Sequence, residues 1–160
     1  MPSDRQRETA RMLRIAHRDL KAARSMLDPD LFDEASWGFH VQQATEKALK
    51  AWISALEVQY PRTHDLALLD QLIIDCGGDP TRFLSLENFT PFGSRLRYDV
   101  LAEPESLDRA AWNQLCADLP SRGLPASMKE AEARAELIDP LLAAAGWGVV
   151  EAKCCALSAN

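Results

Sequence analysis

Apolar residues recur at helical spacing along most of the chain. Residues 4–27 contain no glycine or proline and place apolar side chains at alternating steps of three and four residues: Leu13, Ala16, Leu20, Ala23 and Leu27. This spacing predicts an amphipathic helix, capped by Ser3 or Asp4. After a break at Asp28-Pro29-Asp30, a second long helix is predicted over residues 31–57. Its apolar face consists of Phe39, Leu49, Ile53 and Leu56.

Shorter helices are predicted in the middle of the chain. The pair His64-Asp65 opens a helix whose inward face is apolar, and the two glycines after residue 76 end it. A weaker helical stretch is predicted around residues 81–88. A further helix is predicted over residues 106–119, where prolines and glycines stand on both sides.

No segment alternates apolar and polar residues with the period of two that marks a strand. We therefore predict an all-α protein, an antiparallel up-and-down bundle of four to five helices over residues 1–119. The sequence PSRGLPAS at residues 120–127 is typical of a linker. It leads to a tail over residues 128–160, which contains one more amphipathic stretch.

Composition excludes several classes of protein. With 160 residues, of which 47% are apolar and 26% charged, the chain fits one soluble domain better than a disordered protein. Because there is no run of about eighteen apolar residues and no apolar stretch behind the charged N-terminus, we expect no membrane span, no secretory signal and a cytoplasmic location. The four cysteines are irregularly spaced, so we expect no disulfide framework, no metal site and no cofactor.

The net charge of −6 conceals an asymmetry. Residues 1–27 carry seven basic and three acidic groups, a net of +4, which leaves −10 for the rest of the chain. Five of the basic residues lie opposite the apolar stripe of the first helix: Arg7, Arg11, Arg14, Arg18 and Lys21. A solvated helix face is the simpler interpretation, and weak, sequence-indifferent contact with nucleic acid is the alternative.

Two polar residues fall on the apolar face of the second helix. Burying Gln42 and Glu46 there costs about 2 kcal/mol or more each unless they find hydrogen-bond partners. Lys47 and Lys50 lie one turn apart on the polar side, with Gln43. They could bind a phosphate or a carboxylate, although such a pair is more often a solvated helix face.

The stretch FHVQQATEKALKAWISALEVQYPRTHDL resembles the HEPN family, helical domains named for nucleotide binding in higher eukaryotes and prokaryotes. Such proteins have a DLKAA-type segment in the first helix, a QQAxEKALKA block in the second, a THDL turn and a later RYP-like motif. Here these are residues 19–23, 42–51, 63–66 and Arg97-Tyr98-Asp99, in which the proline is lost. The resemblance covers roughly residues 10–115. It implies an up-and-down bundle, usually a homodimer, often encoded beside a minimal nucleotidyltransferase as a toxin–antitoxin pair.

Many members of that family are metal-independent ribonucleases whose signature is an arginine, four to six residues, then a histidine, near a late helix. That signature is missing, because no histidine follows Arg97. Arg11 and His17 have the spacing but lie in the first helix, where the family does not keep the motif. The other two histidines are His40, expected at the surface or in an interface, and His64. His64 and Arg97 are therefore the catalytic candidates.

A structural role is the simpler interpretation of most of these residues. Asp65 is suited to cap the third helix, and with Gln42 and Glu46 it forms an expected structural polar cluster. If the later loop folds back, Arg97 would neutralise Glu46. The candidate binding residues are Lys47, Lys50, Arg97 and Tyr98.

The tail carries a second resemblance. The stretch MKEAEARAELIDPLLAAAGWGVVE, from Met128, resembles the first residues of the restriction subunit of type I restriction enzymes, and it stops after about two dozen residues. This indicates a gene junction with a truncated restriction gene.

Two functions then remain. The first is a non-catalytic binding and oligomerisation module that partners a nucleotidyltransferase or accompanies a restriction or defence system. A homodimer is expected because Trp37, Phe39 and Trp52 point to different sides of one helix. The alternative is a ribonuclease with a degenerate active site. The missing signature favours the first, so we expect that the protein is not an enzyme.

Overall fold

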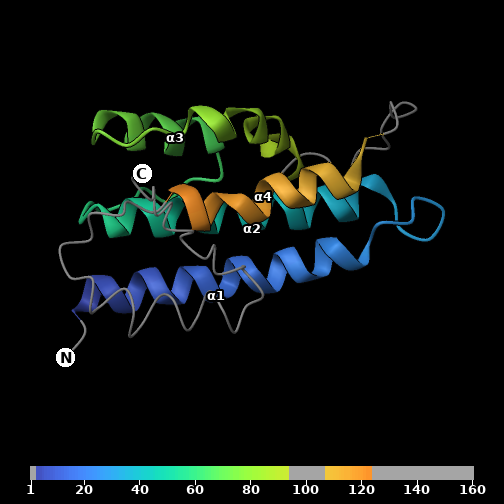
Figure 1. Ribbon diagram of the computed structural model, residues 1–160, viewed down its shortest axis with the longest axis horizontal. Coiled ribbons are helices and arrows are strands. Elements are labelled where there is room, and N and C mark those ends of the chain that lie inside the picture. The colour runs from blue at the N-terminus through green and yellow to red at the C-terminus, as the bar shows by residue number, and fades with distance from the viewer. Residues whose placement is uncertain (1–2, 94–106, 124–160) are drawn as a thin grey trace, which may run out of the picture.

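The computed structural model describes residues 3–93 and 107–123, which form a helical bundle (Figure 1). Its elements, in chain order, are α1 (Asp4–Ser25), α2 (Glu34–Ala55), α3 (Leu66–Asp75), the 3₁₀ segment η1 (Thr81–Gly93) and α4 (Arg109–Gly123). These two ranges contain no strand. The predicted all-α helical bundle is confirmed.

The central element is α2. In Figure 1, α1 runs antiparallel to α2 along one side of it, and α3 and η1 lie along the other side. The last helix, α4, packs against α2 and also contacts α1 and η1. Consequently α1 and α3 occupy opposite faces of the bundle.

The first helix begins as predicted. Ser3 caps it: the Ser3 hydroxyl accepts a hydrogen bond from the Gln6 backbone N–H at 3.2 Å, and the Gln6 side chain accepts one from the Ser3 N–H at 2.6 Å. The predicted stripe is buried except for its last member: Leu27 is 47% exposed. The helix ends at Ser25, so Leu27 no longer follows the helical register and that part of the prediction is wrong.

The second helix begins at Glu34, three residues later than predicted, because Asp33 caps it by accepting from the Ser36 N–H at 2.7 Å. Trp37 and Trp52 are only 0% and 4% exposed. A central helix can bury most of its circumference, since α1, α3, η1 and α4 surround it. The sequence-based reason for expecting a homodimer is therefore wrong for both tryptophans.

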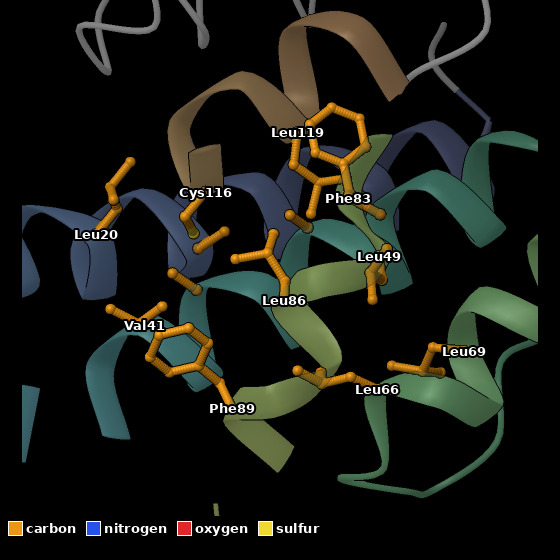
Figure 2. Packing of buried hydrophobic residues seen from close by; sticks show 14 of the residues in the cluster. Leu20, Val41, Leu49, Leu66, Leu69, Phe83, Leu86, Phe89, Cys116 and Leu119 are labelled. Carbon is orange, nitrogen blue, oxygen red and sulfur yellow. The ribbon is translucent and has the colours of Figure 1, made fainter. Parts of the chain in front are cut away.

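The core lies among α1, α2, α3, η1 and α4, and side chains from all five elements contribute to it (Figure 2). Phe89 of η1 makes edge-to-face contacts with Trp37 and Trp112, at centroid distances of 5.5 and 5.1 Å. At Gly38 a Cβ atom would lie 2.3 Å from the Phe92 ring. Glycine at this position thus allows η1 to approach α2 closely.

The later helix ends differ in part from the predictions. Gly77 ends α3 with φ at 83°, the left-handed conformation that glycine adopts without strain. α4 continues through residues 120–123, which were predicted to begin the linker. The tail over residues 128–160 lies outside the described residues, as do Arg97 and Tyr98. In the two described ranges, no helix is both long enough and apolar enough to span a membrane.

Candidate functional site

A buried polar cluster joins α2 to the turn before α3. Gln42, Glu46 and Lys50 are spaced four residues apart, so they lie along one side of α2. Gln42 and Glu46 are both 0% exposed. The prediction that these two polar residues lie on the buried face is confirmed, and the burial demands that every polar atom of Glu46 has a partner.

Glu46 is fully hydrogen-bonded. Its Oε1 accepts from the Nζ atoms of Lys47 at 2.6 Å and Lys50 at 2.7 Å. Its Oε2 lies 2.9 Å from Nδ1 of His64 and accepts from Nε2 of Gln42 at 3.2 Å. Four donors therefore surround one carboxylate, and we name these five residues the Glu46 cluster.

The charge state of Glu46 fixes the tautomer of His64. Burial by itself would raise the pKa of Glu46, but the hydrogen bonds from Lys47, Lys50 and His64 outweigh it and lower that pKa to about 2. Because the carboxylate is ionised at neutral pH and can only accept, Nδ1 of His64 must donate. Neutral His64 then carries its lone pair on Nε2, in a side chain that is 66% exposed.

Further bonds fasten the turn to α2. Lys50 Nζ donates to the Thr63 carbonyl at 2.9 Å, and Gln42 Nε2 donates to the His64 carbonyl at 3.1 Å. Asp65 follows as the N-cap of α3, where its carboxylate accepts from the Ala67 N–H at 3.0 Å. The cluster thus holds the end of α2 and the start of α3 together.

One expectation about charges in this region is corrected. Lys47 and Lys50 were expected on a solvated polar side, but their side chains are only 17% and 9% exposed, because both turn onto Glu46. The expected contact of Arg97 with Glu46 lies outside the described residues. The spacing of Glu46 and Lys50, i to i+4, was the sequence signal for this ion pair.

A second network extends from the cluster to α1, and no local pattern in the sequence predicts it. Lys50 Nζ lies 5.6 Å from the centroid of the Tyr60 ring. The Tyr60 hydroxyl bonds Glu8, which also accepts from Nε of Arg11 at 2.8 Å. The bonds from Arg11 lower the pKa of Glu8 to about 2, although burial opposes them. Arg11 is therefore committed to an internal ion pair.

The basic residues of α1 form an exposed face. This basic face consists of Arg7, Arg11, Arg14, Arg18 and Lys21. Three of them pair with acidic neighbours on the same helix: Arg7 with Asp4, Arg11 with Glu8, and Arg18 with Asp19 at 3.6 Å. Arg14 and Lys21 make no ion pair within the described ranges.

His17 lies on the same helix. Its burial, together with the nearby positive charges of Arg24 and Lys21, lowers its pKa.

His40 lies between α2 and α1. Its Nδ1 is 3.3 Å from Oδ1 of Asp19, and its side chain is 27% exposed. The residue is thus partly buried against α1 within one chain. Nowhere in the described ranges do three histidine, cysteine, aspartate or glutamate residues gather as a metal site would require.

Residues 9–110 match the pattern that defines the HEPN domain. The chain belongs to the HEPN domain family. No curated protein and no solved structure matches it. The matched part of this HEPN domain contains the whole Glu46 cluster. That cluster connects the two segments, QQATEKALKA in α2 and THDL in the turn, that carry the family resemblance.

Proposed function

We propose that this HEPN domain is a binding and oligomerisation module. It pairs with a second copy of itself and with a minimal nucleotidyltransferase, as in a toxin–antitoxin system. An accessory role in a restriction or defence system is a variant of the same proposal, suggested by the resemblance at Met128. The observation that carries the proposal is that the residues characteristic of the family, those of the Glu46 cluster, bond to one another and to the turn before α3.

A group that acts on a ligand must be able to touch it. Glu46 is fully buried, and its two oxygens already accept from four donors. Lys50 is 7% exposed and is bonded to Glu46 and to a backbone carbonyl. Because Glu46 and Lys50 are buried and already bonded, they stabilise the turn before α3 and do not contact a ligand. This supports a structural role for them.

Exposed apolar side chains support a protein partner. Leu31, in the loop between α1 and α2, is 74% exposed, and Leu27 beside that loop is 47% exposed. When a partner protein covers large apolar side chains that were in contact with water, the free energy of the system falls, so such side chains favour association.

The proposal is tested by sequencing the neighbouring genes and co-expressing this chain with a minimal nucleotidyltransferase that they encode. We expect the two proteins to co-purify. We also expect light scattering of this chain alone to give about twice its mass of 17.8 kDa at micromolar concentration. A monomer that does not co-purify would contradict the proposal. Leu31→Ser is the variant expected to weaken association, with Ser25→Ala as a control at the end of α1.

One observation favours a second function, metal-independent cleavage of RNA. The buried Glu46 holds Nδ1 of His64 and leaves Nε2 open to solvent, the arrangement in which an imidazole accepts a proton as a general base. Glu46 would stabilise the imidazolium, and Arg97 is the candidate cation for the phosphate. Cleavage in the presence of a chelator, lost in His64→Ala, would establish this function and overturn the first.

A further inference from the structure

The formal charge of the molecule is separated between two layers. The helix α1 contains seven basic and three acidic residues, a net charge of +4. The segment from Asp65 to Gly93, which contains α3 and η1, has five acidic residues and one basic residue, a net of −4. Between them, α2 has two acidic and two basic residues. The two charged layers lie on opposite sides of a neutral central helix (Figure 1).

The acidic layer has an exposed outer surface with apolar residues in it. We define the acidic face as Leu68, Ile74, Asp75 and Asp79, all of which are exposed. The single cation of this layer, Arg82, is already paired with Asp118 of α4 at 2.6 Å. Leu68 and Asp75, seven residues apart, lie on the same side of α3, and Ile74 lies about a third of a turn around the helix from them. The exposed residues of this layer therefore combine carboxylates with two large apolar side chains.

The basic face offers the complementary chemistry. Arg14 and Lys21 lie two turns apart on α1, both exposed and without an ion pair in the described part of the chain. Long basic side chains can lay their aliphatic stems on apolar residues while their charged ends reach carboxylates. Leu68 and Ile74 would receive the stems, and Asp75 and Asp79 the charged ends.

We propose that the basic face of one copy docks on the acidic face of a second copy. The occupant is another copy of this chain because one molecule carries both a basic and an acidic face, on opposite sides, and cannot bring them together itself. Faces on opposite sides give a heterologous contact, which continues from copy to copy and does not close as a two-fold pair. This contact is distinct from the pairing under the proposed function and does not depend on it.

Such a contact must depend strongly on salt. The Debye length is about 8 Å at physiological ionic strength and about 4 Å at 0.5 M, so the attraction between the two layers weakens across that range. We therefore expect self-association that grows with concentration at low salt and disappears at high salt. A two-fold pair held by apolar residues would persist at high salt, which separates the two modes.

The test is a charge-swap experiment by sedimentation velocity, with nuclease-treated protein at about 0.05 M and about 0.5 M salt. One double variant is Arg14→Glu with Lys21→Glu. Because the three arginines that remain on this face are already paired with acidic residues of α1, this change leaves the basic face with a net negative charge. The other is Leu68→Lys with Asp75→Lys, which makes the acidic face basic. Each alone has two faces of like charge and should lose low-salt association at least about tenfold. Asp30→Lys, at an exposed acidic residue of the loop between α1 and α2, is the matched control and should keep it.

The decisive sample is an equal mixture of the two double variants. Each acidic face in the mixture then finds a basic one on the other variant, so association should return to within about threefold of the unmodified protein. A mixture that stays dissociated would overturn the proposal. So would association that survives in either double variant alone, or that disappears on nuclease treatment, since the last result would show that nucleic acid bridges the copies.

Discussion

Replacing Glu46 with glutamine removes the charge at the centre of the cluster and keeps the size of the side chain. In the folded protein Glu46 holds Lys47, Lys50 and His64 by three bonds of 2.6 to 2.9 Å. Glutamine has one carbonyl oxygen in place of two carboxylate oxygens, so it cannot accept from all of these donors. The variant leaves the buried Lys50 ammonium without its counter-charge, and this is the main cost.

Two independent arguments give the size of that cost. The pKa of Glu46 falls from 4.5 to about 2, and each unit is worth about 1.4 kcal/mol, so the ionised form contributes about 3 kcal/mol at neutral pH. Removing one partner of a buried ion pair costs about 3–5 kcal/mol. We therefore expect Glu46→Gln to lower the free energy of unfolding by about 3 kcal/mol near pH 7.

The stability difference between Glu46→Gln and the unmodified protein should become smaller as the pH falls. Because the folded-state pKa of Glu46 lies below its unfolded value, the contribution is complete above pH 4.5 and is lost as the pH falls toward 2. Urea unfolding, followed by circular dichroism, should show the gap between Glu46→Gln and the unmodified protein narrowing by about 2 kcal/mol from pH 7 to pH 3.

The control is Glu57→Gln, which changes an exposed glutamate just after α2 and should alter stability by less than about 0.5 kcal/mol at each pH. A gap for Glu46→Gln that is equally small at pH 7, or one that stays constant down to pH 3, would refute the argument.

Three further variants test the packing and the domain boundary. Burial and the neighbouring Glu87 raise the pKa of Asp70 from 3.8 to about 7, so its contribution to stability is complete below pH 3.8 and is lost as the pH rises to about 7. Thermal melts should therefore show Asp70→Asn gaining about 4 kcal/mol relative to the unmodified protein between pH 4 and pH 8, and a gain that does not vary with pH would count against this. Gly38→Ala forces a Cβ against the Phe92 ring and should cost about 1–3 kcal/mol in urea unfolding, so an unchanged midpoint would show that η1 does not pack there. Deleting residues 128–160 should change stability by less than about 1 kcal/mol, and a loss of several would show that the tail packs on the bundle.

Much of the fold could be predicted from local patterns. The stripe of α1 and the capping residue Ser3 are local signals, and the structure follows them. The same holds for Asp65 and Gly77, which begin and end α3. Long-range packing could not be predicted this way: Trp37 is buried against elements distant in the chain, and Asn113 of α4, 76 residues away, accepts from its indole N–H at 3.0 Å. The spacing of apolar residues within one helix does not reveal how many other helices surround it.

The candidate site shows the same division. Burial of Gln42 and Glu46 could be predicted from the period of α2. The partners of Glu46 could not be ranked from spacing alone, because His64 lies 18 residues away and comes near only through the turn. Lys47 and Lys50, on the same helix as Glu46, supply counter-charges that the sequence analysis did not assign to it. Long side chains close in sequence can cover a buried carboxylate on their own helix at little cost in chain entropy.

The central claim, that the Glu46 cluster serves the fold of a binding module, is tested most directly by incubating the purified protein with single-stranded RNA in a chelator. We expect no cleavage above that of a buffer control. We also expect His64→Ala, which changes an exposed side chain, to leave self-association unchanged. Cleavage by the unmodified protein that His64→Ala abolishes, while the circular dichroism spectrum stays the same, would contradict the account and make His64 a catalytic residue.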